Sequence, residues 1–234
     1  MTLKALIFDV DGTLAETEEA HRQAFNETFA ARGLDWHWDR EDYRRLLATT
    51  GGKERMRAFQ ADLPEGARRL SDDEIAALHA EKTARYGEIL ASGGLALRPG
   101  IAELVELARE AELGLAVATT TNRPNVEALT RCCWGKPAEQ VFDVIAAGDE
   151  VAAKKPAPDV YRLALARLGL PPRECIAFED SRNGLVSATR AGLAVIVTPS
   201  AYTDHEAFGG AAHCVPSLAR PDWPPILRAV LLGH

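Results

Sequence analysis

The stretch Leu6-Ile7-Phe8-Asp9-Val10-Asp11-Gly12-Thr13 decides which fold we expect, because an apolar run ends abruptly in two aspartates. An unpaired carboxylate buried in a strand costs several kcal/mol, and two neighbouring carboxylates also repel one another. The strand should therefore end at Asp9, where Gly12 permits a sharp turn. The two acids then face water, as in an ordinary solvated turn, or a cation lies between them.

The composition is that of an ordinary globular protein. The 234 residues are 47% hydrophobic and 26% charged, with a formal net charge of −7 that argues against a nucleic acid partner. No apolar run approaches the ~20 residues that span a bilayer, and the first strand follows Met1 too closely for a signal peptide. We therefore expect a cytoplasmic protein without a membrane partner, and take a monomer as the working assumption. The four cysteines, Cys132, Cys133, Cys175 and Cys214, show no metal-ligand or disulfide spacing and are expected to be free thiols.

Short β-rich apolar runs recur along the chain and predict a parallel sheet. They cover residues 5–8, 115–118, 142–146, 175–178 and 194–197. The runs are continuous rather than alternating, which is typical of strands buried on both faces. Helical patterns separate most of them, one after Pro99-Gly100, one over 159–168 and one after Asn183 that stops at Gly192. We predict an α/β fold with a doubly wound parallel sheet, whose site lies at the carboxyl ends of the strands.

Residues 16–94 break this alternation, because they show helical patterning and no convincing strand. Phe25 and Phe29 share one helix face, Asp39 can cap a second helix, and the capping box Ser71-Asp72-Asp73-Glu74 begins another. Ser92-Gly93-Gly94 then looks like a hinge. We predict a small α-helical cap domain over 16–94, inserted after the first strand, and a core domain of residues 1–15 and 95–234. The cap is well placed to act as a lid over the two aspartates.

Polar groups also follow the other predicted strands. Thr119-Thr120-Thr121-Asn122 offers hydroxyl and N–H groups that suit a phosphate, although such residues also serve as plain helix N-caps. Lys154-Lys155 supplies positive charge, and Glu179-Asp180 repeats the acid pair. Several carboxylates in oxygen-only surroundings suit Mg²⁺. This sheet edge therefore predicts Mg²⁺-dependent phosphoryl transfer, in which one aspartate attacks phosphorus and the other moves the proton.

The polar groups at the strand ends resemble a known set of four motifs. In order and spacing, Asp9-Val10-Asp11-Gly12-Thr13, Thr119, Lys155-Pro156 and Glu179-Asp180 resemble the motifs of the haloacid dehalogenase-type phosphatases. The resemblance covers essentially the whole chain, including a helical cap after the first motif. It implies a Rossmann-like core and a Mg²⁺ ion held by Asp9, by the main-chain carbonyl of Asp11 and by Asp180, with Glu179 contributing through water.

The same resemblance implies the catalytic roles. Asp9 would form an aspartyl-phosphate and Asp11 would act as general acid and base, while Thr119 and Lys155 would hold the phosphoryl group. Lys154 is the competing choice for the lysine. Dehalogenases proper lack the second aspartate and need no Mg²⁺, so the presence of Asp11 favours phosphoryl chemistry.

Specificity is expected from the cap and from the loop after the second strand. The candidate substrate contacts are Glu16, His21, Thr50, Gly51, Gly52, Lys53, Thr120, Thr121, Asn122 and Arg123. The paired glycines allow close backbone approach, and Lys53 or Arg55 can hold a second anionic group; a plain loop with solvated charges is the alternative. Glu16 and His21 can bind a sugar hydroxyl, although a histidine packed on a helix is as ordinary.

Three stretches resemble the CbbY-like branch of this family: ETEEAHRQAFNETF (16–29), TTGGKERM (49–56) and ATTTNRPNV (118–126). That branch is associated with the Calvin cycle and carbon fixation. It removes phosphate from sugar bisphosphates, notably xylulose-1,5-bisphosphate. Two phosphate-binding sites, one in the core and one on the cap, would fit such a substrate. A β-phosphoglucomutase-type phosphoryl transfer and a non-enzymatic sugar-phosphate-binding module are the alternatives.

Overall fold

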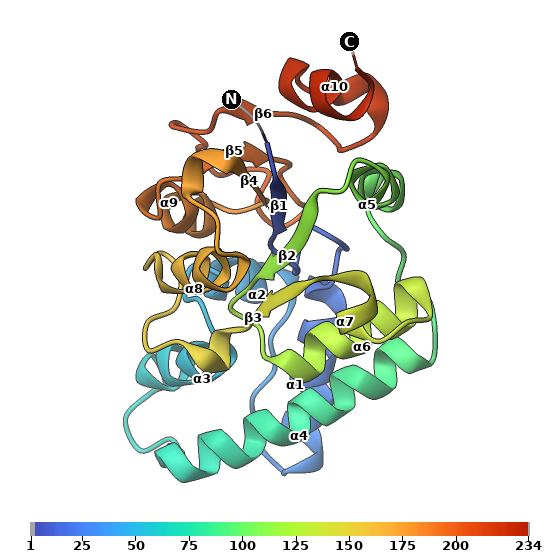
Figure 1. Cartoon of the computed structure of the whole chain (residues 1–234). Helices are drawn as coiled ribbons and strands as arrows, with labels where there is room; N and C mark the ends of the chain where they lie inside the picture. The colour runs from blue at the N-terminus through green and yellow to red at the C-terminus, as the bar shows by residue number, and fades with distance from the viewer. Residues whose placement is uncertain (1–2, 234) are drawn as a thin grey trace.

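The centre of the structure, a computed structural model that describes residues 3–233, is a six-stranded sheet. The strand order is β3-β2-β1-β4-β5-β6, and every pair is parallel (Figure 1). The strands are β1 (Ala5–Phe8), β2 (Gly114–Ala118), β3 (Val144–Ala146), β4 (Cys175–Glu179), β5 (Ala194–Val197) and β6 (His213–Cys214). The predicted doubly wound α/β fold is confirmed, with the strand that precedes the two aspartates in the middle of the sheet.

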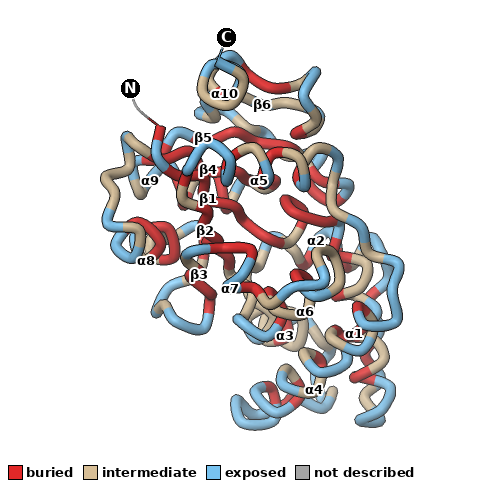
Figure 2. The backbone as a smooth tube through the Cα atoms, turned by 45° about the vertical axis from the view of Figure 1, so that its right-hand side comes forward, coloured by how far each residue is buried: buried red, intermediate tan, exposed pale blue. Residues whose placement is uncertain are grey.

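Helices cover both faces of the sheet. The side chains of β1 alternate between the two faces, so each face contributes to an apolar core. Leu6 and Phe8 lie in the core under α5 (Ile101–Glu110), α6 (Arg123–Trp134), α7 (Ala138–Val141) and α10 (Pro225–Leu231). Ala5 and Ile7 lie in the core under α8 (Asp159–Leu168) and α9 (Arg182–Arg190). The backbone is buried through the sheet and exposed over much of the outer surface (Figure 2). Burial on both faces explains why the strand sequences are continuous apolar runs.

A separate helical layer packs below the carboxyl ends of the strands in the view of Figure 1. It consists of α1 (Glu18–Ala31), α2 (Arg40–Leu46), α3 (Gly52–Ala61) and α4 (Asp72–Ala91). The layer has its own aromatic core, which includes Phe25, Phe29 and Trp38. Both predicted caps form, since the Asp39 side chain accepts the N–H of Asp42 and Ser71 begins a complete capping box.

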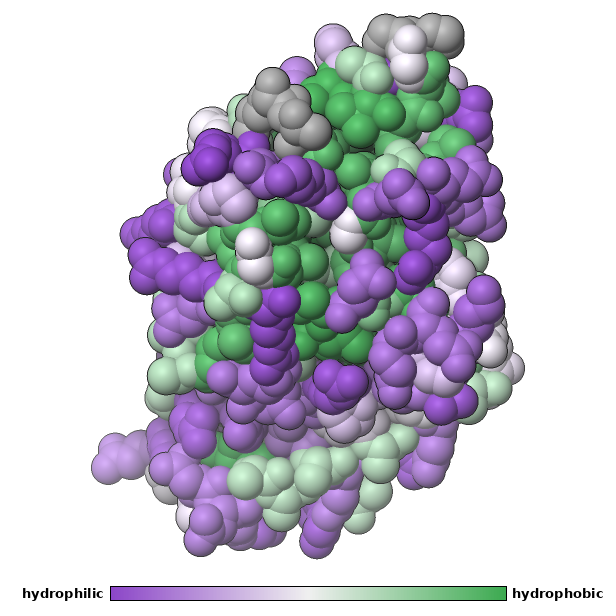
Figure 3. Space-filling view, viewed as in Figure 1, coloured by the Kyte–Doolittle hydropathy of each residue, from purple (hydrophilic) through white to green (hydrophobic). Residues whose placement is uncertain are grey.

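The chain crosses between core and cap at two neighbouring points. Ala15 forms a bridge with Leu97, so the way into the cap and the way out lie side by side. Helix α4 of the cap also packs against α6 of the core. Hydrophilic side chains dominate the lower part of the space-filling view, over the cap (Figure 3). We propose these crossings as the boundaries of the cap domain.

The sequence-based prediction was wrong at two short strands. The third strand begins at Val144 rather than at residue 142, because Asp143 turns its carboxylate to accept the N–H of Leu115. Strand β6 has two residues and no apolar run to reveal it. Helix α3 begins at Gly52, within the stretch for which a plain connecting loop was the alternative interpretation.

Two smaller expectations concern the cysteines and the membrane. All four cysteines are free, as expected from their spacing. Among the described residues, no helix has the length and apolar character needed to cross a bilayer.

Candidate active site

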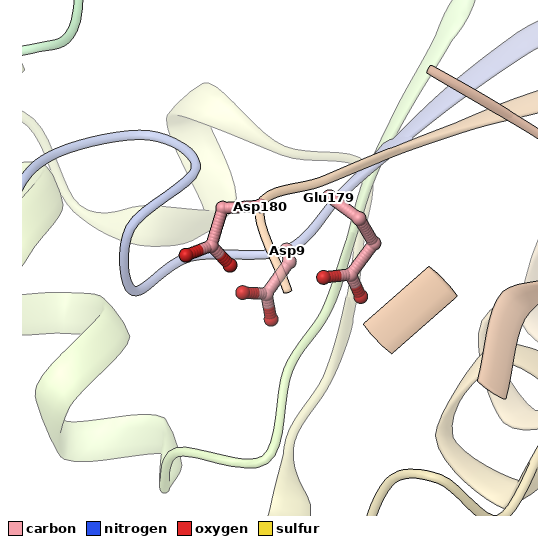
Figure 4. A group of neighbouring side chains, drawn as sticks. All are labelled: Asp9, Glu179 and Asp180. Atoms are coloured by element: carbon pink, nitrogen blue, oxygen red, sulfur yellow. The ribbon is translucent and has the colours of Figure 1, made fainter. Parts of the chain in front are cut away.

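A cavity lies between the sheet and the cap, at the carboxyl ends of the central strands. Its core wall includes Asp9, Thr119, Lys155 and Asp180, and its cap wall comes from α1, α3 and α4. The side chains of Asp9, Glu179 and Asp180 converge from the ends of neighbouring strands (Figure 4). Parallel strands place their carboxyl ends at one edge, which is where such sheets bind ligands.

Three buried carboxylates form a compact cluster on the core wall. Asp9, Glu179 and Asp180 each offer one oxygen, and these oxygens lie within 4.8 Å of one another. The register of the sheet creates this cluster, because Phe8 pairs with Phe178 and the N–H of Asp9 donates to the carbonyl of Phe178 over 3.0 Å. The residue after each paired phenylalanine is therefore an acid at the same edge.

Lys155 balances part of this negative charge. Its Nζ lies 2.6 Å from Asp9 Oδ1 and 2.6 Å from Glu179 Oε1, and the side chain is buried. Tyr161, beneath it, donates its hydroxyl to Glu179 and presents its ring to the ammonium group at 5.0 Å. Lys154 instead donates to the carbonyl of Gly148. The geometry therefore favours Lys155 over Lys154 as the lysine that meets a phosphoryl group.

The carboxylates outnumber the cations that face them, and the pKa values of Asp9 and Asp180 are raised. Burial raises the pKa of Asp9 to about 7, with Lys155 opposing the shift and Glu179 adding to it. Burial also raises the pKa of Asp180 well above its usual range, followed by the charges of Asp9 and Glu179. Glu179 Oε2 is buried without a hydrogen-bond partner. An oxygen-only donor set with an excess of negative charge and an orphaned carboxylate oxygen fits Mg²⁺.

Asp11 has a different environment, at the half-buried end of a hydrogen-bonded chain. Its Oδ1 accepts the Thr17 hydroxyl over 2.7 Å and lies 3.0 Å from His21 Nε2, and His21 Nδ1 lies 2.6 Å from Lys82 Nζ. An ammonium group has no acceptor, so Lys82 donates to Nδ1, and we assign the imidazole proton to Nε2, facing Asp11. The His21 ring stacks on Tyr86 with centroids 4.0 Å apart, which fixes its orientation.

The Asp11 chain also shifts the pKa of each member. Burial alone would raise the pKa of Asp11, but the contacts with His21 and Thr17 and the charge of Lys82 outweigh it and lower the pKa to about 2. Burial lowers the pKa of His21 to about 4, and the charge of Lys82 adds to this effect. Burial likewise lowers the pKa of Lys82 to about 7, against the attraction of Asp11. Lys82 is therefore the member of the chain that exchanges its proton near neutral pH.

The hydroxyl block after β2 lies on the core wall as predicted from its position. Thr119 is buried and its hydroxyl accepts the N–H of Thr121 over 3.2 Å. Thr120, Thr121 and Asn122 line the cavity. The Asn122 side chain also caps α6 through the N–H of Asn125 and donates to Thr83 of the cap. The simple capping role and the cavity-lining role therefore coexist in Asn122.

The predicted cap stretch reaches the cavity through the start of α3. Thr50, Gly51, Gly52 and Lys53 all line it. Gly51 has a φ of 99°, a conformation that favours glycine, and a Cβ on Gly52 would lie 2.5 Å from His79 Nε2. Arg55 lines the cavity too, but it is buried and donates to the Tyr43 hydroxyl over 2.9 Å and to the carbonyl of Leu46. Lys53 is thus the better placed of the two for an anionic group.

Two predicted substrate contacts lie outside the cavity. Glu16 points to the hinge side, where it pairs with Arg98 over 3.2 Å and accepts the N–H of Ala201. Arg123 is half-exposed at the start of α6 and faces Glu139. Neither is among the residues that line the cavity, so the structure does not bring Glu16 and Arg123 together with the other predicted substrate contacts. Neighbouring residues in a turn or helix point in different directions, and spacing alone did not reveal which would face the site.

Among the residues of the cavity wall that sequence reasoning missed are three titratable side chains of the cap, those of Glu18, His79 and Lys82. Glu18 is buried with Oε2 unpartnered, and burial together with Asp180 and Asp11 raises its pKa well above the usual range. Lys82 and His79 come from α4. Lys82 did leave a signal, because it falls in the apolar stripe of residues 75, 78, 82 and 86, where a charged side chain is out of place.

Comparisons with known proteins agree with this geometry. The sequence profile of the haloacid dehalogenase-like hydrolases matches residues 3–192, and the chain belongs to this family. Phosphatases are among the curated relatives that it matches, and the chain is an enzyme that hydrolyses phosphoric monoesters.

Particular relatives belong to the CbbY-like branch. The chain is 62% identical to the protein CbbY of Rhodobacter capsulatus over 94% of this chain and 95% of that protein. The crystal structure of CbbY from Rhodobacter sphaeroides in complex with phosphate has a TM-score of 0.90 at 57% identity, and covers 94% of this chain and 96% of that one. A mutant of the same protein, in complex with xylulose-1,5-bisphosphate, matches with the same TM-score, identity and coverage. The expected resemblance to the CbbY-like branch is confirmed.

Proposed function

We propose that this enzyme is a Mg²⁺-dependent phosphatase that removes one phosphate from a sugar bisphosphate, such as xylulose-1,5-bisphosphate, through an aspartyl-phosphate on Asp9. The observation that carries the proposal is the position of Asp9, which lines the cavity, pairs with Lys155 and belongs to the cluster of three carboxylates. The cap wall above it carries lysines that suit a second phosphate. The likeness to CbbY, which was crystallised with this bisphosphate, supports the choice of substrate and the association with carbon fixation.

In the first step, the carboxylate of Asp9 attacks phosphorus and the bond from phosphorus to the sugar oxygen breaks. Thr119 and Lys155 hold the phosphoryl oxygens. Asp9, Asp180 and the main-chain carbonyl of Asp11 would hold Mg²⁺, with Glu179 acting through water. When bound, this ion neutralises the charge that the carboxylates and the phosphate bring together.

The leaving sugar oxygen needs a proton, and Asp11 would deliver it. In the empty site Asp11 is ionised, since its pKa is about 2. A phosphate dianion beside it raises this pKa, because like charges disfavour ionisation. The chain from Lys82 through His21 can then supply the proton: Lys82 protonates Nδ1 while Nε2 passes its own proton to Asp11.

In the second step, water attacks the aspartyl-phosphate and the bond between phosphorus and Asp9 breaks. Asp11, now ionised, takes the proton of that water, and this proton returns through His21 to Lys82 when the phosphate leaves, which completes the cycle. The cap must close for the first step and admit water for the second. The hydrogen bonds that join the cap to the core beside the cavity include those from Asn183 to Thr50 over 3.0 Å and from Asn122 to Thr83 over 3.2 Å.

The test is phosphate release from a panel of sugar monophosphates and bisphosphates, with Mg²⁺ and with EDTA. We expect Mg²⁺-dependent release that favours a pentulose bisphosphate. Asp9→Asn serves as the blank and should lower turnover by about 10,000-fold or more, because it removes the nucleophile. Release that persists in EDTA would contradict the metal requirement.

The same panel separates the alternatives. An isomerised sugar phosphate without net phosphate release would overturn the proposal in favour of a mutase. Tight binding of the bisphosphate with neither product would point to a binding module. Appreciable turnover by Asp9→Asn would remove Asp9 from the role of nucleophile.

A further inference from the structure

Arg98 lies where the chain returns from the cap to the core, and it has no part in the mechanism above. It is not among the residues that line the active-site cavity, and only 12% of its side chain is exposed. Its main-chain N–H donates to the carbonyl of Leu14 over 2.8 Å, beside the bridge that joins the two crossings between core and cap. A guanidinium group so far from water needs protein partners for its N–H donors.

The guanidinium group connects the first motif with the loop after β5. Its Nη1 donates to the carbonyl of Gly12, directly after Asp11, and to the carbonyl of Thr198 over 2.7 Å. Its Nη2 donates to the carbonyl of Pro199 over 2.7 Å. Its Nε lies 3.2 Å from a carboxylate oxygen of Glu16, on the hinge side. One planar cation is therefore shared by three main-chain carbonyls and a carboxylate.

The loop that Arg98 contacts is bonded in turn to Asp180. Thr203 of this loop donates its hydroxyl to the main-chain carbonyl of Asp180 over 2.7 Å and lies 3.3 Å from the carboxylate. The N–H of Ser200 donates to the same hydroxyl over 2.9 Å. Gly12 packs so closely against Asp180 that a Cβ there would clash with the carboxylate. Arg98 is therefore connected to Asp180 both through the loop and through the first motif.

We propose that Arg98 is a positioning residue for the Mg²⁺ site. It fixes the main-chain carbonyl of Asp11 relative to the carboxylate of Asp180, and its contact with Glu16 ties both to the hinge. The proposal rests on the Mg²⁺-dependent function proposed above, in which these two oxygens hold the ion. Mg²⁺ demands near-ideal octahedral geometry, so ligands that drift apart lose affinity for it. A lysine would keep the charge but lacks the planar fork that reaches several carbonyls at once.

The test compares Arg98→Lys and Arg98→Met with the control Arg109→Lys. Arg109 also donates to main-chain carbonyls, those of Gln140 and Val141, which lie outside the cavity. The dissociation constant of Mg²⁺ is measured on the free protein, from the rise of the free energy of unfolding in urea with Mg²⁺ concentration. It should increase about tenfold or more in both Arg98 variants and stay within about twofold in the control.

This measurement separates positioning from a general loss of stability. A variant that is only less stable loses the same free energy of unfolding with and without Mg²⁺, and its dissociation constant is unchanged. Phosphate release from xylulose-1,5-bisphosphate gives a second readout. The Mg²⁺ concentration for half-maximal activity should rise about tenfold or more in Arg98→Lys, while the KM for the bisphosphate at saturating Mg²⁺ stays within about threefold.

Glu16→Gln keeps the guanidinium group but removes the charge that orients it. The dissociation constant of Mg²⁺ should rise about threefold in this variant, which decides the question if the Arg98 variants do not fold. Wild-type affinity for Mg²⁺ in Arg98→Lys, or in Glu16→Gln where only that variant folds, would overturn the role of Arg98 alone. A wild-type protein that gains no stability from Mg²⁺ and releases phosphate in EDTA would overturn the metal requirement of the proposed function, and the positioning role with it.

Discussion

The two walls of the cavity differ in charge and in construction. The core wall is acidic and is built from the ends of neighbouring strands, whose register fixes Asp9 beside Glu179. The cap wall is cationic and combines side chains from three helices, including Lys53 and Lys82. Phosphoryl chemistry needs positions held to a fraction of an ångström, which a hydrogen-bonded sheet provides.

The two aspartates of the first motif show the same contrast at the scale of single residues. Asp9 belongs to the core wall, and burial raises its pKa to about 7. Asp11 is held by groups of the cap, His21 and Lys82, which help to lower its pKa to about 2 despite its burial. The core therefore sets the protonation state of Asp9, the proposed nucleophile, while the cap sets that of Asp11, the proposed acid and base.

Among the changes that test this difference between the two aspartates, replacement of Asp11 should lower activity most. We expect Asp11→Asn to lower kcat by about 100- to 10,000-fold, because the leaving oxygen and the attacking water both lose their proton partner. Phospho-enzyme should accumulate, which intact-mass measurement after rapid acid quench would detect. Turnover equal to that of the wild-type enzyme would rule out the proton-transfer role.

Lys82→Met should have a smaller effect on activity and a measurable one on stability. We expect kcat to fall by about 10- to 100-fold, because Asp11 loses the source of its proton. Burial lowers the pKa of Lys82 from 10.5 to about 7, so the unfolded chain binds this proton more tightly between these pH values. As the pH increases, the free energy of unfolding of the wild-type protein should therefore rise relative to that of the variant, by up to ~1.4 kcal/mol per pH unit.

Urea unfolding of both proteins between neutral pH and about pH 9.5 measures this difference. The variant should be the more stable at neutral pH, and the gap should narrow as the pH rises. Parallel pH dependences in the two proteins would contradict a depressed pKa for Lys82.

The smallest expected effect concerns the outer part of the cap wall. Lys53→Ala should raise the KM for xylulose-1,5-bisphosphate by about tenfold and that for a pentulose monophosphate by much less, because it removes one cation near the second phosphate. Arg123→Ala is the matched control, since Arg123 lies outside the cavity, and should change either KM by less than about twofold. Steady-state phosphate release measures both. Equal losses on the two substrates would exclude a role of Lys53 at the second phosphate.

The sequence by itself determined the sheet and the position of the polar groups of the core wall. Apolar runs predicted the five longer strands to within two residues, because strands buried on both faces have a local signature. Asp9, Thr119 and Glu179-Asp180 each lie at or just past a strand end, so the topology alone brings them to one edge. The caps at Asp39 and Ser71 were visible for the same reason, since a helix cap depends on residues three apart.

Only the tertiary structure decided which cap residues face the cavity. The chain from Asp11 through His21 to Lys82 joins residues far apart in the sequence, and the contact of Gly52 with His79 joins two helices. Side-chain direction also distinguishes Lys155, which contacts Asp9, from Lys154, which does not. It likewise distinguishes Glu18, which is buried, from Glu16, which pairs with Arg98. These distinctions depend on how the cap packs on the core, and packing between separate elements leaves little local trace in a sequence.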